Sequence, residues 1–199
     1  MPNIILLGKS AVGKSTMENL LCENLRYTKS VSCTTRPKRE GEVNGKDYYF
    51  ISEDEFNLHE KSGDFLETAE YRGWKYGTLK NELNKDKNMV FVLNPEGFRQ
   101  FEENNIEAIS FMIHVEPTER MIRQLLRGDD PAEVVRRFTT DNRDFVGVTT
   151  DYEVSNDTDR YECLLEILED IFYYYSDTKY DEEKRTIRSK IEEYLDSED

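Results

Sequence analysis

The chain has 199 residues, of which 35% are charged and 37% are hydrophobic, and its formal net charge is −15. This length fits one domain with a small additional lobe. The negative charge argues against general affinity for nucleic acid, which depends on lysine and arginine side chains that neutralise phosphates. No uninterrupted apolar run reaches the about 18 residues that suggest a membrane span. We therefore expect neither nucleic-acid nor membrane partners.

The N-terminus and the cysteines both indicate where in the cell the protein resides. The segment Met1–Asn3 lacks the basic start of a signal peptide and leads directly into an apolar run. The three cysteines, Cys22, Cys33 and Cys163, are odd in number and widely spaced, which is typical of reduced thiols. We therefore predict a cytoplasmic protein without a disulfide framework.

Short apolar runs separated by helix-length segments organise most of the chain. The first run is 3–7, and Gly8 ends it; from Lys14 onward apolar residues recur at helical spacing. Further buried strands are expected at 89–93 and 109–115. Strands that alternate with helices in this way predict an α/β fold with a parallel sheet flanked by helices.

Three segments differ from this alternation. Residues from about 30 to 78 are rich in Tyr, Thr, Gly and charge, and predict a small mixed lobe in which Ser52 caps a helix. The arginine-rich stretch 117–145 is predicted to be helical with a break at 128–131. After an amphipathic helix that ends near residue 175, a charged tail follows to the C-terminus.

The segment from Gly8 to Ser15 matches the P-loop pattern G-x-x-x-x-G-K-[ST] at every fixed position. Its glycines let backbone N–H groups turn toward phosphate oxygens, and the helix that follows directs its positive end at the same anion. Lys14 would supply a cation to the β- and γ-phosphates, and Ser15 would supply a hydroxyl ligand to Mg²⁺. The predicted ATP-phosphate residues are Gly8, Ser10, Ala11, Val12, Gly13, Lys14, Ser15 and Thr16. The motif leaves the phosphoryl acceptor open.

A basic cluster follows in an otherwise acidic chain. Arg36, Lys38, Arg39 and Lys46 fall within eleven positions, and Tyr48 adds a hydroxyl donor. Guanidinium groups bind phosphate through two parallel hydrogen bonds. The cluster is therefore either a second phosphate site or a solvated basic loop, and the residues alone leave both interpretations open.

The segment Thr34–Phe50 fits the pattern T-[ST]-R-x-x-[RK]-x-G-E-x-x-G-x-x-Y-x-F, and with the upstream P-loop it closely resembles the guanylate kinase family. Lys75–Thr78 and Val154–Asp157 match the family as well, so the resemblance covers about residues 3 to 175. It implies a P-loop parallel sheet flanked by helices, with an inserted mixed α+β acceptor-binding lobe and a helical lid. The implied boundaries are a core of 1–31, 79–119 and 146–175, an acceptor lobe of 32–78, a lid of 120–145, and a charged helical C-terminal extension of 176–199.

The resemblance also implies roles for individual residues. The phosphate of the nucleoside monophosphate would be held by Arg36, Arg39, Tyr48 and Tyr76, with Glu42 orienting the arginines. Ser32 and Glu67 would read the guanine, and Thr78 belongs to the same acceptor site. Arg127 and Arg137 would close over the transferring phosphoryl group and act in catalysis with Lys14 and Arg39, and Asn156 would lie by the adenine.

Guanine presents two adjacent donors, N1–H and the N2 amino group, and a single carboxylate can accept both. Adenine presents an acceptor at N1, which the carboxylate of Glu67 would repel. Together with this argument, the resemblance implies Mg²⁺-dependent transfer of the γ-phosphoryl group from ATP to GMP or dGMP. The transfer would be a direct in-line displacement without a protein nucleophile. Whether such an enzyme would be a monomer or a homodimer stays open.

Two positions depart from the family pattern. Family members usually end the strand at 89–93 with a D-x-D-x-Q-G-like segment. This chain has Val92–Gly97 there, so Val92 and Asn94 stand at the two carboxylate positions. This loss of carboxylates motivates one alternative, a nucleoside monophosphate kinase with shifted or broadened base choice. A second alternative is an inactive interaction module of the same fold, against which the intact P-loop argues. A P-loop hydrolase is disfavoured because no residue is marked as a water-positioning group.

Overall fold

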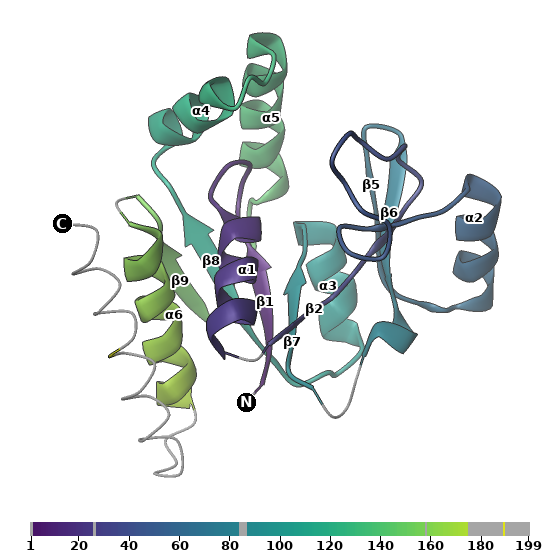
Figure 1. Ribbon diagram of the computed structural model, residues 1–199, viewed down its shortest axis with the longest axis horizontal. Coiled ribbons are helices and arrows are strands. Elements are labelled where there is room, and N and C mark those ends of the chain that lie inside the picture. Colours follow the sequence, from purple (N-terminus) through teal and green to yellow (C-terminus); the bar gives the residue numbers. More distant parts are fainter. Residues whose placement is uncertain (1, 26, 84–86, 158, 175–188, 190–199) are drawn as a thin grey trace.

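The computed structural model describes residues 2–25, 27–83, 87–157, 159–174 and 189. Within them the chain forms two sheets, one parallel and one mixed, that lie side by side with a pair of helices projecting above the parallel sheet (Figure 1). The fold class expected from the sequence is confirmed, since the central sheet is parallel and flanked by helices and a second, mixed sheet is inserted.

The parallel sheet has the strand order β2-β7-β1-β8-β9, with β1 at its centre. Ile4 of β1 pairs with Val90 of β7 on one side and with Ile109 of β8 on the other. The strands of this sheet are β1 (Asn3–Leu7), β2 (Thr28–Lys29), β7 (Met89–Val92), β8 (Ala108–His114) and β9 (Tyr152–Ser155). The connections that follow β1 and β8 lead in opposite directions along the sheet, to β2 and to β9. The carboxyl end of β1 therefore lies at a crevice of the kind that binds ligands in open α/β sheets.

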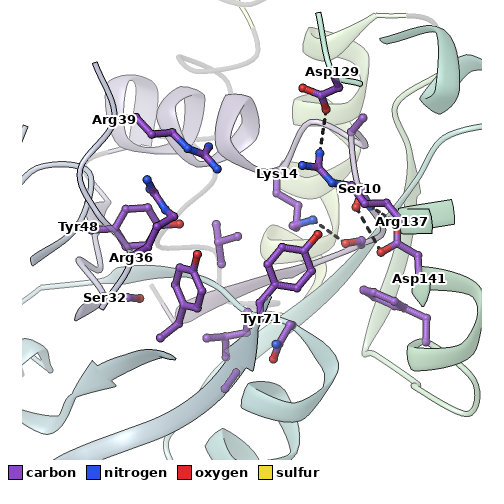
Figure 2. A pocket seen from close by; sticks show the side chains of 18 of the residues that line it. Ser10, Lys14, Ser32, Arg36, Arg39, Tyr48, Tyr71, Asp129, Arg137 and Asp141 are labelled. Atoms are coloured by element: carbon purple, nitrogen blue, oxygen red, sulfur yellow. Dashed lines mark hydrogen bonds and ion pairs between the residues drawn. The ribbon is translucent and has the colours of Figure 1, made fainter. Parts of the chain in front are cut away.

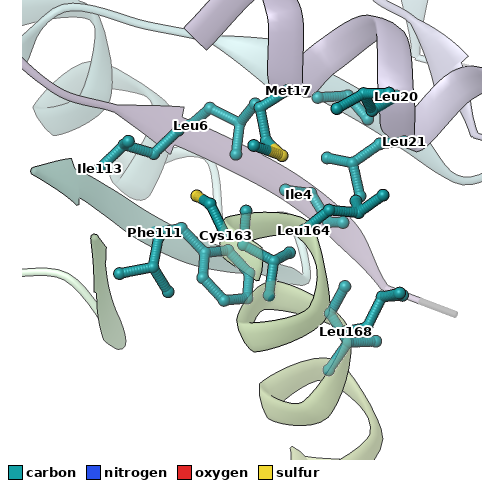
Figure 3. Close-up of a cluster of buried hydrophobic side chains, with 14 of the residues drawn as sticks. Ile4, Leu6, Met17, Leu20, Leu21, Phe111, Ile113, Cys163, Leu164 and Leu168 are labelled. Atoms are coloured by element: carbon teal, nitrogen blue, oxygen red, sulfur yellow. The ribbon is translucent and has the colours of Figure 1, made fainter. Parts of the chain in front are cut away.

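Alternate residues of β1 serve the two faces of this sheet. Ile4 and Leu6 pack with α1 (Lys14–Leu25) and α6 (Arg160–Tyr174), in the cluster that Figure 3 shows. Ile5 and Leu7 face the opposite way, toward α3 (Pro95–Glu103). The period of two in a strand explains why an uninterrupted apolar run is needed here, since both faces are covered by helices.

We call the second sheet, with α2, the small lobe. Its strand order is β4-β3-β6-β5; β3 runs parallel to β4 and antiparallel to β6. Its elements are β3 (Cys33–Thr34), β4 (Tyr49–Phe50), α2 (Glu53–Ser62), β5 (Phe65–Tyr71), β6 (Trp74–Leu79) and the short 3₁₀ helix η1 (Lys80–Glu82). As expected, Ser52 caps α2, where its hydroxyl accepts from the N–H of Glu55. The amide of Gln100 bonds both the N–H and the carbonyl of Thr68, which ties α3 to β5.

We call α4 (Pro117–Leu126), α5 (Pro131–Asp144) and the loop between them together the lid. Each helix has a proline at its start, where the missing N–H has no intrahelical partner to lose. Asp130 caps α5 by accepting from the N–H of Glu133, and Gly128 stands at a positive φ of 88° between the helices. The break expected at 128–131 is therefore present.

The bounds of two strands differ slightly between the sequence prediction and the structure. The strand expected at 89–93 ends at Val92, and the one expected at 109–115 runs from Ala108 to His114. The predicted extension 176–199 lies outside the described residues except for residue 189, and the domain boundaries stay predictions. All three cysteines are free thiols. In the described part of the chain, none of the helices is both long and apolar enough to cross a bilayer.

Candidate active site

One cavity of about 730 Å³ lies between the P-loop, the small lobe and the lid. Figure 2 shows Arg36, Arg39 and Tyr48 on one side of it, and Ser10, Lys14 and Arg137 on the other. The lining residues that the sequence predicted are Gly8, Ser10, Ala11, Lys14, Ser32, Arg36, Arg39, Glu42, Tyr48, Glu67, Tyr76, Arg127 and Arg137. Residues from distant parts of the chain thus share one space, with the P-loop at one end and the basic cluster at the other.

Six predicted residues do not line this cavity, among them Asn156, which is described below. Val12 is in the hydrophobic core, at 1% exposure, and Thr16 is exposed on α1. Ser15 and Thr78 line an adjoining cavity of about 300 Å³, which shares Ser32, Glu42, Tyr48 and Val92 with the first. Gly13 shapes the P-loop from within, since it has a positive φ of 95°.

The Lys14 side chain folds back over its own loop. Its Nζ donates to the carbonyls of Gly8 at 2.6 Å and Lys9 at 3.2 Å. Burial lowers the pKa of Lys14 to about 8, while the nearby charge of Asp141 opposes that shift. The ammonium is therefore a poorly solvated cation that an arriving phosphate would stabilise.

Asn156 bonds the P-loop rather than an open nucleotide pocket. Its side-chain Nδ2 donates to the carbonyl of Val12 at 2.8 Å, and its backbone N–H donates to the carbonyl of His114 at 2.9 Å. The residue is 6% exposed, and a side chain at Gly13 would place its Cβ 2.5 Å from that same Nδ2. In this structure Asn156 fixes the shape of the loop, and its predicted place by the adenine stays a prediction.

The small-lobe side of the cavity contains an arginine that is held in place by a carboxylate. Arg36 donates through Nη2 and Nη1 to the two carboxylate oxygens of Glu42, at 2.6 and 3.1 Å. The hydrogen bonds from Arg36 lower the pKa of Glu42, so this carboxyl stays ionised. The guanidinium also lies over the rings of Tyr48 and Phe50, at 5.5 and 5.6 Å from their centroids. Arg39 is exposed and shows its guanidinium to the cavity (Figure 2).

The floor of the cavity carries a buried carboxylate. Glu67 of β5 is 6% exposed, and burial raises the pKa of its carboxyl group, against hydrogen bonding from Thr78. Ser32 and Thr78 share a hydroxyl–hydroxyl bond of 3.0 Å. A Cβ at Gly97 would lie 2.5 Å from Oε2 of Glu67, so only glycine fits there without a shift of the carboxylate. A buried carboxylate of this kind is suited to a ligand with paired N–H donors.

The lid arginines are paired with carboxylates of the lid itself. Arg137 donates to Asp129 and to Glu133, both at 2.8 Å, and Arg127 also donates to Asp129. Hydrogen bonds from Arg136 and Arg137 lower the pKa of Glu133 to about 2. Glu133 also pairs with Arg72 of the small lobe at 3.1 Å, so an ion pair joins the lid to the small lobe.

The two positions that depart from the family pattern both line the cavity. Val92 offers no polar atom there, and the Oδ1 of Asn94 accepts from the N–H of Gly97 at 2.8 Å. Asn94 is thus the N-cap of α3, a role for which asparagine is well suited.

Several lining residues were not identified from the sequence. Tyr71, Asp129, Asp141 and Phe145 all face the cavity. An acidic residue in an arginine-rich segment has the pattern of an ordinary surface ion pair, so no local signal marked Asp129 or Asp141. Gly97 lay within the noted segment after the strand, but its contact with Glu67 joins positions 30 residues apart.

The residues present fit a Mg²⁺ ion that is held mainly by substrate. Among the described residues, no group of three or more His, Cys, Asp or Glu side chains is arranged to bind a metal. Kinase Mg²⁺ ions keep several waters and take one or two protein ligands beside the phosphates of the nucleotide. The exposed hydroxyl of Ser15, at the start of α1, can be such a ligand.

Comparisons with known proteins agree with this geometry. Residues 1–175 match the family model described as guanylate kinase. The guanylate kinase of Symbiobacterium thermophilum is 37% identical over 172 residues, covering 79% of this chain and 81% of the relative. That of a Nostoc species is 36% identical over 83% of this chain and 86% of the relative. The crystal structure of guanylate kinase from Anaplasma phagocytophilum superposes with a TM-score of 0.67 at 28% identity, over 89% and 88% of the two chains.

The resemblance noted from two motifs therefore extends over most of the chain and over its tertiary structure. A model match to residues 1–175 and relatives above 30% identity that are covered over most of their length leave no other family in question. The chain belongs to the guanylate kinase family.

Proposed function

We propose that this protein transfers the γ-phosphoryl group of ATP to GMP or dGMP, giving ADP and GDP or dGDP. The observation that carries the proposal is the single cavity in which the P-loop faces a buried carboxylate and an arginine cluster. One end suits a triphosphate and the other suits a guanine nucleotide with one phosphate. The names of the relatives, all guanylate kinases, support the same activity.

The acceptor would be bound by its two ends. Its phosphate would meet Arg36 and Arg39, with Tyr48 and Tyr76 as hydroxyl donors; Glu42 pre-orients Arg36 through the bidentate pair. Its base would place N1–H and N2–H against Glu67, with Ser32 and Thr78 beside them. Two separate anchors fix the orientation of the phosphate oxygen that attacks, which is the main protein contribution to in-line phosphoryl transfer.

The donor would lie on the P-loop. Lys14 would leave the carbonyls of Gly8 and Lys9 for the β- and γ-phosphates, and Arg127 and Arg137 would exchange Asp129 for the transferring group. These cations neutralise charge on the phosphoryl oxygens as the bond to the leaving ADP lengthens, and closure of the lid excludes water. Bound Mg²⁺ would neutralise phosphate charge further, with Ser15 as its protein ligand.

The domain assignment follows from these roles. We propose residues 32–78 as the acceptor-binding lobe, 120–145 as the lid and the remainder up to 175 as the core. A specific observation keeps one alternative: Val92 and Asn94 offer no carboxylate beside Glu67, so the base pocket has fewer acceptors than the family pattern provides. An inactive interaction module is disfavoured because Lys14 and both phosphate-binding ends of the cavity are retained.

The test is a coupled assay of ADP formation against a panel of GMP, dGMP, AMP, CMP and UMP. We expect kcat/KM for GMP or dGMP to exceed that for AMP by at least about tenfold, because a carboxylate matched to two donors faces an acceptor in adenine. Comparable kcat/KM values across the panel would contradict the guanine assignment but not the proposed kinase activity. Absence of ADP formation with every acceptor would contradict the proposal itself.

A further inference from the structure

A carboxylate from the lid is hydrogen-bonded to the P-loop. The backbone N–H of Ser10 donates to Oδ2 of Asp141 at 2.7 Å, and the Ser10 hydroxyl donates to Oδ1 at 3.3 Å. Asp141 belongs to the last turns of α5 and reaches the loop from the lid side of the cavity (Figure 2). P-loops bind phosphate through backbone N–H groups of this kind, so Asp141 uses a donor that a phosphate oxygen would use.

Other contacts hold this carboxylate in place. Arg120 of α4, only 3% exposed, donates through Nη1 to Oδ2 of Asp141 at 3.4 Å. The neighbouring residue Asn142 accepts from Nζ of Lys9 at 2.7 Å, so two successive residues of α5 bond two successive residues of the loop. The charge of Asp141 is therefore kept beside Lys14 by groups from both lid helices.

A carboxylate and a phosphate cannot use this position together. One N–H makes one well-aligned hydrogen bond, and two anions at that distance repel each other strongly where water is partly excluded. Binding of a triphosphate in the P-loop must then release Asp141 from Ser10. Since Asp141 is part of α5, that release also detaches the end of the helix from the loop.

We propose that Asp141 is a further positioning residue of the donor site, which occupies the Ser10 N–H in the free protein and thereby sets the affinity for ATP. The proposal rests on the proposed function only in taking ATP as the donor. ATP binding is then coupled to movement of α5. The free energy needed to break the Ser10–Asp141 contacts makes ATP binding weaker by the same amount.

The test compares ATP binding by the full chain and its Asp141→Asn variant, by calorimetry without any acceptor nucleotide. Asparagine keeps the shape of the side chain and removes its charge. We expect ATP to bind about tenfold more tightly to the variant, both with Mg²⁺ and with a chelator. In turnover assays KM for ATP should fall while KM for GMP stays unchanged, a split that general damage to the fold would not produce.

Asp144→Asn is the matched control. Asp144 belongs to the same helix, carries the same charge and pairs with the exposed Arg143 at 3.0 Å, away from the cavity. Loss of the Asp144 charge should change ATP affinity by less than about twofold. An equal gain in both variants would assign the effect to net charge, and an unchanged affinity in Asp141→Asn would also overturn the proposal. Weaker binding in that variant with Mg²⁺ alone would mark Asp141 as a metal ligand instead and would equally overturn it.

The Asp141→Asn variant could fail to fold, because Arg120 would lose its carboxylate partner. A measurement on the unaltered chain tests the proposal in that case. The NMR signals of the Ser10 amide and of the Asp141 carboxyl carbon should both shift when ATP saturates the protein. A carboxyl carbon signal that stays in place at saturation would overturn the proposal. Failure of the unaltered chain to bind ATP at all would contradict the proposed function rather than this inference alone.

Discussion

Gly97, in the first turn of α3, leaves the space that the carboxylate of Glu67 fills. A methyl group at position 97 would lie 2.5 Å from Oε2 of Glu67 and 3.3 Å from Oδ1 of Asn94, the cap of the same helix. Neither neighbour can retreat freely, because Glu67 is buried in β5 and Asn94 bonds the N–H of Gly97. The end of the cavity that Glu67 lines is thus shaped by a residue without a side chain.

The first prediction concerns this contact. Gly97→Ala should displace the Glu67 carboxylate and lower kcat/KM for GMP by about tenfold, since a misaligned acceptor leaves guanine donors unpaired. Affinity for ATP, measured by calorimetry, should stay within about twofold and serves as the internal control. A folded variant with unaltered GMP kinetics would show that Glu67 does not contact the base.

The second prediction concerns the charge of Glu67. Burial raises the pKa of its carboxyl group, and only the ionised form accepts both guanine donors. In the unaltered protein kcat/KM for GMP should therefore rise with pH through that raised pKa. Glu67→Gln should lack this limb and should discriminate less between GMP and AMP, as judged by the monophosphate panel. Retention of full base preference by the glutamine variant would contradict the assignment.

The third prediction follows from the Lys14 pKa of about 8. An arriving triphosphate should raise this pKa, so ATP binding near pH 8.5 should take up protons, measured by calorimetry in buffers of different ionisation enthalpy. Lys14→Met should abolish that uptake and collapse kcat. The unfolded chain keeps the proton up to its ordinary pKa of 10.5, so the Lys14 contribution to the free energy of unfolding should rise with pH between about 8 and 10.5. Buffer-independent binding in the unaltered protein would contradict this account.

The fourth prediction separates two adjacent arginines of the lid. Arg137 lines the cavity and is bonded to Asp129, whereas Arg136 is more exposed and donates to Glu133 and to the hydroxyl of Tyr71. Arg137→Ala should lower kcat by about 10³, the scale for an arginine that stabilises a transferring phosphoryl group. Arg136→Ala is the matched control and should lower kcat by less than about tenfold. Equal losses would indicate damage to the lid instead of loss of a catalytic charge.

The fifth prediction uses the basic loop of the small lobe. Arg36→Ala should raise KM for GMP by roughly ten- to a hundredfold, because charge-assisted bonds to the monophosphate are lost. Lys38→Ala removes the same charge from an exposed residue of the same loop that does not line the cavity, and should change KM by less than about threefold. ATP affinity should stay unchanged in both. A fall in ATP affinity in Arg36→Ala would place this arginine in the donor site.

Local patterns in the sequence were sufficient for the parallel sheet and for the phosphate loop. An uninterrupted apolar run such as 3–7 is apolar on both faces of the strand, so it needs helices on both sides of the sheet. A glycine-rich turn between a strand and a helix is typical of phosphate binding. The cap at Ser52 and the break at 128–131 likewise depend on residues within a few positions of one another. These features follow from short-range chemistry, so the order of the residues is enough to predict them.

Tertiary structure decided the partners of the charged groups. Nothing local pairs Ser10 with Asp141, which is 131 positions away, or Gly97 with Glu67, and Asn156 lies against Val12 only because β9 ends beside the P-loop. The sequence marks each as an ordinary acid, glycine or amide. Electrostatic and steric effects act over a few ångströms in space. The Ser10–Asp141 hydrogen bond and the space around Glu67 therefore arise only when distant segments of the chain are brought around one cavity.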